Sequence, residues 1–264
     1  EVPDHLETVL KKRITYEVNR DEFLFTVKKV GRYYVRNGNE IIVDPLPDAA
    51  ESSVRLFLLG TSVGVLLHQR NMLPFHSSAI ITENGAVLFA GASGAGKSTT
   101  AAAFSYHRGY SLLADDVSVL SVVDDQVVVT PGFPGQRLRA DALEKLKLDN
   151  DSFENVRPEM EKFNVPMGEQ YYDGEPVPVR NIYILGTAAK DEMIFKPIEG
   201  LQKFSAIINL IYRQNILDDM QRQQDIMKIF MPLVQHVKLI RVARPKGENT
   251  IEAVLDMLEE DFQQ

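Results

Sequence analysis

The sequence has 264 residues, 44% of them hydrophobic, enough to bury the core of one large domain or of one domain with an appendage. Its formal net charge of -8 argues against nucleic acid or an anionic membrane as the main partner. The absence of cysteine excludes disulfides and thiolate metal sites, and the apolar stretches are too short to span a bilayer, so we expect a soluble protein of the cytoplasm.

Residues 1–47 predict a small N-terminal β-rich subdomain. Short apolar segments separated by turn-forming residues indicate a β meander with strands over 14–18, 23–30, 33–35 and 41–43. After Pro45 and Pro47 the spacing changes, and apolar residues recur at helical intervals from Val54 to Gln69. This helix opens the second predicted domain, residues 48–264.

The next segment predicts an α/β fold with a mixed sheet. Asn84 and Gly85 form a strong hairpin signal between strands over 77–82 and 86–90. A helix over 97–106 and a strand over 111–114 follow, and a second hairpin joins strands over 117–122 and 127–130. Because the strand before the glycine-rich segment is paired antiparallel, the sheet cannot be wholly parallel.

The rest of the chain continues the alternation of helices and strands. A short helix is expected over 140–146, and the polar stretch 149–174 has little periodicity, so we interpret it as a loop or lid. The remaining predicted strands cover 177–185, 193–197 and 237–242, and the remaining helices cover 201–217, 219–230 and 250–261.

One motif points directly to nucleotide binding. The segment from Gly91 to Ser98 fits G-x-x-x-x-G-K-[ST] and lies between an apolar strand and a helix-forming run of alanines. Glycines let successive backbone N–H groups turn inward, Lys97 reaches the β- and γ-phosphates, and the Ser98 hydroxyl ligates Mg²⁺. The residues expected to bind ATP are Gly91, Ala92, Ser93, Gly94, Ala95, Gly96, Lys97, Ser98 and Thr99.

An acidic pair follows the next strand. Asp115 and Asp116 are expected at its carboxyl end, where α/β sheets place their ligands. One carboxylate is suited to hold Mg²⁺ while the other accepts a proton from an attacking hydroxyl. The alternative reading is a turn-forming pair between two strands.

His76 and several arginines are further candidates. If Asn84 and Gly85 are the two loop residues of the hairpin, His76 lies opposite Ser93 and beside the phosphate loop. Phosphoryl transfer also needs cations that balance charge on the transferred group. The arginines considered for this are Arg137 and Arg139, with Arg180 and Arg213 as weaker candidates.

These motifs resemble a known family. The His76 segment, the loop from Gly91 to Ser98 and the pair Asp115-Asp116 have the order and spacing seen in HPr kinase/phosphorylase and its relatives, over roughly residues 58–143. The resemblance implies a P-loop kinase core of the phosphoenolpyruvate carboxykinase/HPr kinase type. It also implies Asp115 as the catalytic base, Asp116 as its neighbour near the metal, and His76 as the histidine beside the phosphates.

Within that family, the segments around Asp44, Phe57 and Gln69 look more like the HPr-kinase-related proteins of ribosomal peptide pathways. Among these, lasso-peptide tailoring kinases phosphorylate the terminal serine of a precursor peptide. Thr99 stands where true HPr kinases usually carry an acidic residue, and their glycine-containing signature downstream of the aspartates is not found.

The leading hypothesis is therefore an ATP- and Mg²⁺-dependent serine kinase that acts on a precursor peptide. A second hypothesis takes HPr as the acceptor, with or without reverse phosphorolysis. A third, of another class, is a nucleotide-binding regulatory module without transfer activity, and a small-molecule kinase is also left open. The acceptor is the expected partner, and assembly into homo-oligomers is compatible with the resemblance.

Overall fold

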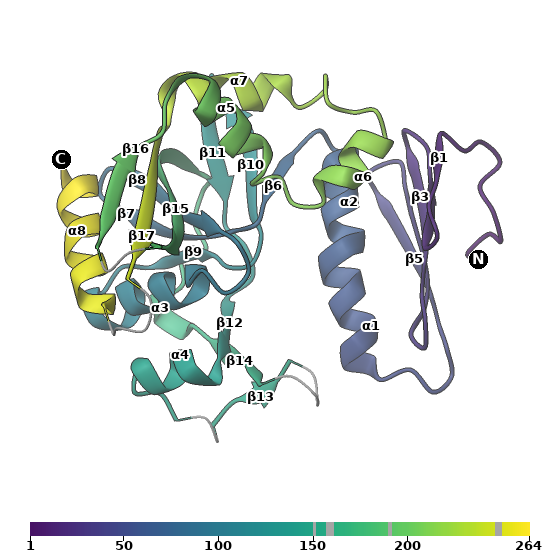
Figure 1. Ribbon diagram of the computed structural model, residues 1–264. Helices are drawn as coiled ribbons and strands as arrows, with labels where there is room; N and C mark the ends of the chain where they lie inside the picture. The colour runs from purple at the N-terminus through teal and green to yellow at the C-terminus, as the bar shows by residue number, and fades with distance from the viewer. Residues whose placement is uncertain (150–151, 157–160, 190–191, 246–249) are drawn as a thin grey trace. The chain divides into compact units, whose positions relative to one another are not determined.

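The computed structural model describes residues 1–264 except 150–151, 157–160, 190–191 and 246–249 (Figure 1). It divides into two compact units, and each is described by itself. The first contains Glu1–Pro74 and Ile211–Lys228, and the second contains Phe75–Leu210 and Ile229–Gln264.

The first unit is an antiparallel sheet covered by a broken helix. Its strands follow the chain order and comprise β1 (Lys11–Lys12), β2 (Tyr16–Val18), β3 (Glu22–Val27), β4 (Gly31–Arg36) and β5 (Glu40–Pro45). The expected helix is present as α1 (Glu51–Phe57), a π-helical turn over Leu58–Ser62 and α2 (Val63–Gln69). The meander predicted from the first 47 residues is therefore the sheet of this unit.

The division differs from the boundary expected after residue 47. Val54, Phe57 and Val65 pack against the same cluster as Phe23 and Tyr33 of the sheet, so the helix belongs to the first unit. The short helix α6 (Gln214–Asp219) joins this cluster through Ile216, although it lies far along the chain. The sequence alone did not reveal that these two helical segments belong to the first unit, because their assignment depends on which apolar face covers the sheet.

The described residues of the second unit form a mixed sheet with helices packed on it. Its strands run in the order β6-β10-β11-β15-β8-β7-β9, with β17 paired to β15 and β16 paired to β17. Strand β15 is parallel to β8 and β17, whereas β7 is antiparallel to β8 and β9. The strands are β6 (Leu73–Phe75), which enters the second unit at Phe75, β7 (Ser77–Thr82), β8 (Gly85–Gly91), β9 (Leu112–Ala114), β10 (Ser118–Val123), β11 (Gln126–Thr130), β15 (Val177–Thr187), β16 (Ile194–Pro197) and β17 (Lys238–Arg244).

Helices α3 (Lys97–Arg108) and α8 (Ile251–Gln263) pack on one face of this sheet. Phe89 of β8 stacks on Phe104 of α3 with 5.6 Å between ring centroids, and Phe262 of α8 contacts Phe104 at 5.4 Å. Figure 1 shows α5 (Gly200–Ile208) and α7 (Met227–His236) together, away from α3 and α8. The α/β class and the mixed sheet expected from the sequence are both confirmed.

The segment expected to be a loop or lid contains regular structure. Strand β14 (Lys162–Pro166) pairs with β12 (Gly135–Arg139) along its full length and with β13 (Glu154–Asn155), and a 3-10 turn covers Gly168–Gln170. Phe163, Val165 and Met167 alternate along the chain, and Val165 and Met167 are buried in the main core. The expectation was wrong for these residues because this period-two pattern was missed; residues 150–151 and 157–160 of the predicted lid lie outside the described residues.

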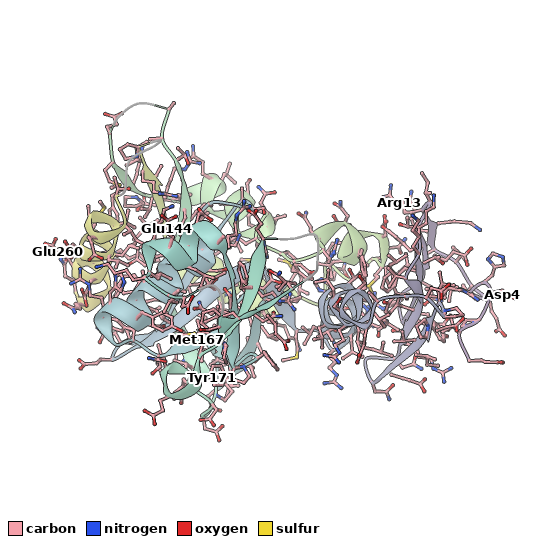
Figure 2. The ribbon with its side chains drawn as sticks, turned by 90° about the horizontal axis from the view of Figure 1, so that it is seen from below. Asp4, Arg13, Glu144, Met167, Tyr171 and Glu260 are labelled. Carbon is pink, nitrogen blue, oxygen red and sulfur yellow. The ribbon has the colours of Figure 1, made fainter. Side chains whose placement is uncertain are left out.

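Two side chains after β14 show how this segment is fixed within its unit. Figure 2 labels Met167 and Tyr171 below α4 (Ala140–Lys145). The Tyr106 hydroxyl of α3 lies 3.8 Å from the Met167 sulfur, and the Tyr171 hydroxyl donates to the carbonyl oxygen of Gly132. These contacts attach the segment to both α3 and the loop before β12.

The two long helices predicted over 201–217 and 219–230 are also corrected. Helix α5 ends at Ile208, α6 covers Gln214–Asp219, and α7 starts at Met227. The chain leaves the second unit at Ile211, where the Tyr212 amide donates to Pro74 O at 2.8 Å and Arg213 adopts a positive φ of 57°. Arg213 directly precedes α6, and a left-handed residue cannot lie inside a right-handed helix, which helical spacing does not report. Among the described residues, no helix is both long and apolar enough to cross a membrane.

Candidate phosphate-transfer site

The candidate residues meet at one edge of the mixed sheet. Because β7 is antiparallel to both β8 and β9, the start of β7 and the ends of β8 and β9 lie at the same edge. His76 comes just before β7, Gly91 ends β8, and Asp115 follows β9. The topology therefore brings together three segments that the sequence separates by tens of residues.

The hairpin register differs from the expected one by two residues. Thr82 pairs with Gly85 and Ser77 pairs with Ala90, so Glu83 and Asn84 form the loop and His76 lies level with Gly91 rather than Ser93. Asn84 is held by its own side chain, whose amide donates to Phe262 O at 3.2 Å. A shift of two residues keeps every side chain on its predicted face. His76 consequently remains beside the loop, as expected.

The phosphate loop joins β8 to the first turn of α3. Gly91 has a φ of 138°, and a Cβ there would lie 2.4 Å from the carbonyl oxygen of Leu185 in the neighbouring strand. Gly96 has a φ of 100° and directly precedes Lys97, the first residue of α3. Both conformations are strained for any residue with a side chain. The loop thus combines glycine-dependent geometry with a helix N-terminus, the arrangement that favours a bound phosphate.

Lys97 lies within the loop. Its Nζ donates to Gly91 O at 3.0 Å and to Ala92 O at 3.2 Å, and the residue is only 7% exposed. Burial lowers the pKa of Lys97, while the negative charges of Asp116 and then Asp115 raise it. The ammonium group is therefore close enough to both carboxylates to be attracted by them.

Asp115 is fixed by two hydrogen bonds. Its Oδ1 accepts from the Ser78 hydroxyl at 2.5 Å, and its Oδ2 accepts from the Arg137 backbone N–H at 3.0 Å. Ser78 is fully buried in β7, so this support is rigid. Each carboxylate oxygen has a second lone pair that is free to accept a proton or another hydrogen bond. The position therefore suits a general base.

Asp116 occupies a different environment. It has a positive φ of 68°, and its Oδ2 lies 3.1 Å from Nη1 of Arg137. The His76 ring Nδ1 lies 2.9 Å from Asp116 O and 3.7 Å from Asp116 Oδ1. The Asp116 side chain is 36% exposed, so this carboxylate is held between two nitrogen groups while remaining accessible.

The four candidate arginines separate clearly. Arg137 lies in the site through its contacts with both aspartates. Arg139 is two residues further along β12, has a 71% exposed side chain and lies 3.5 Å from Asp141, so it does not join the described cluster. Arg213 belongs to the first unit, where it donates to Thr61. Arg180 lines a hollow at the opposite ends of the strands.

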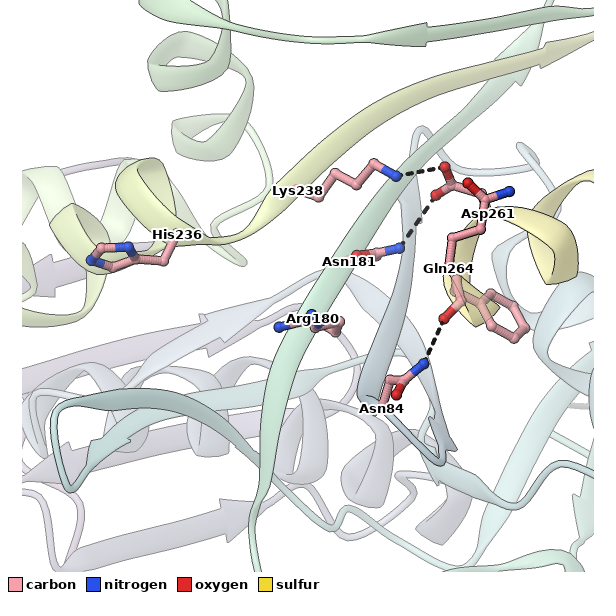
Figure 3. Close-up of a pocket in the computed structure, with 8 residues that line it drawn as sticks. Asn84, Arg180, Asn181, His236, Lys238, Asp261 and Gln264 are labelled. Carbon is pink, nitrogen blue, oxygen red and sulfur yellow. Dashed lines mark hydrogen bonds and ion pairs between the residues drawn. The ribbon is translucent and has the colours of Figure 1, made fainter.

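That hollow is shown in Figure 3 and encloses about 320 Å³. It lies beside Asn84 at the amino end of β8 and Lys238 at the amino end of β17, away from the phosphate loop. Asp261 binds Lys238 at 2.6 Å and accepts from Tyr183 at 2.6 Å, so these three polar groups satisfy one another. It is a separate feature from the candidate site.

Sequence reasoning missed several residues that the fold brings to the site. Arg244 ends β17, which runs parallel to β8 through β15, and its Nη2 lies 3.9 Å from the place of a Cβ on Gly96. Lys162 of β14 is close enough to lower the pKa of Lys97 by repulsion, although burial contributes more. The rule that parallel strands end at one edge identifies Arg244, but only once the strand order is known.

Gln136 is a further supporting residue. It is 1% exposed, and its Nε2 lies 3.4 Å from Ser98 O at the start of α3. Its Oε1 is buried without a hydrogen-bond partner among the described residues. An unpaired buried amide oxygen is costly, so this atom is suited to accept from a water molecule or ligand beside Ser98.

The residues present fit a bound Mg²⁺. Hydroxyl and carboxylate oxygens are its preferred protein ligands, and it usually keeps several waters while also binding substrate phosphates. Ser98 and Asp116 supply such oxygens and would hold the ion, and the unpaired Gln136 Oε1 would be available to a water molecule beside Ser98. Within the described residues there is no cluster of three or more His, Asp and Glu side chains suited to a metal.

Comparison with known proteins gives limited information. No protein-family model and no curated protein matches the chain. Among solved structures, the chain is similar to the Hpr(Ser) kinase/phosphatase from Coxiella burnetii, with 12% identity over 72% of this chain and 90% of that chain. The TM-score is 0.34, so the functional proposal rests on the motif and the geometry of the site.

Proposed function

We propose that the protein is an ATP- and Mg²⁺-dependent kinase that transfers the terminal phosphate of ATP to a serine hydroxyl of a peptide or protein. One observation supports it above all: a phosphate loop and a hydrogen-bonded carboxylate pair lie at the same edge of one sheet. A nucleotide-binding module without transfer activity needs no acceptor base, so a carboxylate fixed beside the loop favours the kinase.

The proposed binding roles follow from the groups in place. Backbone N–H groups from Gly91 to Ser98 and the N-terminus of α3 hold the phosphates, and Lys97 moves from its loop carbonyls to phosphate oxygens. Ser98 and Asp116 would hold Mg²⁺, which supplies positive charge to the terminal phosphates. Thr99, the next residue of α3, completes the expected nucleotide contacts.

Asp115 is the proposed general base. It accepts the proton of the serine hydroxyl as the oxygen attacks the terminal phosphorus, and the bond from that phosphorus to the bridging oxygen of ADP breaks. The hydrogen bonds from Ser78 and Arg137 hold its oxygens in one orientation. His76 positions Asp116 through the carbonyl contact at 2.9 Å.

Cations around the loop would balance the charge of the transferred group. Arg137 already contacts Asp116, and Arg244 and Lys162 approach the loop from two other strands. Fixed positive groups aimed at developing charge stabilise a phosphoryl-transfer transition state. Arg139 lies outside the cluster, and its proposed role is limited to contact with the substrate.

The acceptor is proposed from the sequence resemblance. The segments around Phe57 and His76 favour the C-terminal serine of a lasso-type precursor peptide, and HPr is the second candidate acceptor. The core of phosphoenolpyruvate carboxykinase/HPr kinase type, cytoplasmic location and homo-oligomeric assembly belong to the same proposal.

The deciding experiment measures binding and transfer separately. Calorimetry with Mg·ATP tests the loop, and mass spectrometry of serine-containing precursor peptides and of HPr after incubation with Mg·ATP tests transfer. We expect one added phosphate on a serine, lost in Asp115→Asn but retained in Asp124→Asn, the same change in an exposed turn. If the protein binds nucleotide but phosphorylates no acceptor, the regulatory module is favoured over the kinase. If it neither binds nucleotide nor transfers phosphate, the proposal is overturned.

A further inference from the structure

Two positive side chains face each other on neighbouring strands of the second unit. Lys196 of β16 pairs directly with Arg241 of β17 in antiparallel register, and both residues are exposed. Within the described part of the chain, neither makes an ion pair with a carboxylate. Like charges directly opposite one another destabilise a sheet, so this pair is a cost to the folded chain alone.

These cations line a groove of about 520 Å³ between the sheet and α5. Its apolar wall includes Ile184 of β15, Ile198 and Leu201, and Leu201 is 88% exposed. A large aliphatic side chain that is this exposed to solvent beside a groove is typical of a binding surface rather than of a core. The groove therefore offers apolar contact at one wall and positive charge at the other.

Two residues that line the groove are neighbours of residues at the candidate phosphate-transfer site in the same unit. Asn209 lines the groove, and the next residue, Leu210, accepts a hydrogen bond from the His76 amide at 2.9 Å. On the sheet side, Ile184 is paired with Ala90, the residue before Gly91. A chain lying in the groove would thus reach the edge where the phosphate loop and the aspartates lie.

We infer that this groove binds a segment of the acceptor peptide that carries both apolar and acidic side chains. The inference rests on the proposed kinase function and deepens it by naming the chemistry of the substrate. Lys196 and Arg241 would pair with the acidic side chains, and Leu201 would cover the apolar ones. The complementary charge relieves the repulsion between the two cations, which a neutral or basic peptide cannot do.

Binding can be tested without transfer. The probes are fluorescein-labelled peptides of ten residues with one serine, two leucines and either two Glu, two Gln or two Lys, the rest being glycine. Fluorescence anisotropy should rank the Glu peptide about tenfold above the Gln peptide, with the Lys peptide weakest, and added salt should reduce the difference.

Charge reversal is the decisive variant. In Lys196→Glu/Arg241→Glu, the preference should invert, so that the Lys peptide binds better than the Glu peptide. The matched control Lys11→Glu/Lys28→Glu makes the same change of net charge on exposed residues of the first unit and should keep the original preference. Leu201→Ser should weaken all three peptides without changing their order.

The outcomes separate this inference from the proposed function. If Mg·ATP binding and serine transfer are observed but the charge-reversal variant keeps the original peptide preference, the groove is not the acceptor site and the kinase proposal stands. If the preference inverts but no acceptor is phosphorylated, the groove binds peptides and the kinase proposal fails. Concentration-dependent self-association in place of peptide binding, abolished by Leu201→Ser, would assign the groove to a second copy of the chain and overturn the inference.

Discussion

Replacing Asp115 by asparagine tests the proposed base with little disturbance of its surroundings. The Arg137 backbone N–H can only donate, so the amide oxygen of the new side chain must face it. The amide nitrogen then faces Ser78, whose hydroxyl can rotate from donor to acceptor. Both hydrogen bonds are kept, so the loss of stability should stay below about 1 kcal/mol.

The effect on transfer should be much larger. An amide cannot take up the proton of the acceptor serine, and loss of a positioned base typically slows a reaction about 10²–10⁴-fold. A 10³-fold decrease corresponds to roughly 4 kcal/mol of transition-state stabilisation. Single-turnover phosphorylation of an acceptor peptide, calorimetry with Mg·ATP and thermal unfolding would measure transfer, nucleotide binding and stability on the same preparations.

Two companion variants separate catalysis from support. Asp115→Ala removes both acceptors, leaving a buried Ser78 hydroxyl and the Arg137 N–H unpaired, so it should cost about 1–3 kcal/mol for each group. Ser78→Ala keeps the carboxylate and should retain most of the transfer rate. Transfer by Asp115→Asn at close to the wild-type rate would refute the assignment of this residue as the base.

Three further variants test the loop and the first unit. Lys97→Met should raise the Kd for Mg·ATP about tenfold or more in calorimetry, and an unchanged affinity would contradict the role of Lys97 in phosphate binding. The variant should lose no thermal stability, because burial already disfavours the ammonium group and lowers its pKa. Gly91→Ala should cost about 3 kcal/mol in chemical denaturation, because the new Cβ would meet Leu185 O at a positive φ; a neutral result would contradict the described loop geometry. Glu17→Gln should destabilise the first unit above pH 4.5, since a hydrogen bond from Lys12 lowers the pKa of Glu17 to about 2. That difference from wild type should disappear as the pH falls toward 2, and a difference that persists there would contradict the assigned cause.

The sequence by itself determined most of the elements and the nature of the loop. Strong local signals sufficed: alternating apolar residues marked the β meander, and the glycines from Gly91 to Gly96 marked a turn that only glycine fits easily. It also indicated that Asp115 and Asp116 follow a strand. Whether these aspartates and His76 act with the loop remained a hypothesis, because local patterns carry no information on which strands are neighbours.

Tertiary structure decided the rest. The hairpin places its loop at Glu83 and Asn84, where the Asn84 side chain contacts Phe262, and the support of Asp115 by Ser78 depended on the pairing of β7 with β9. Arg244 approaches the loop only because β15 joins β17 to β8 in parallel. Such contacts join residues far apart in the chain and are set by which apolar faces bury one another, whereas a helix or a glycine turn is specified by its own few residues.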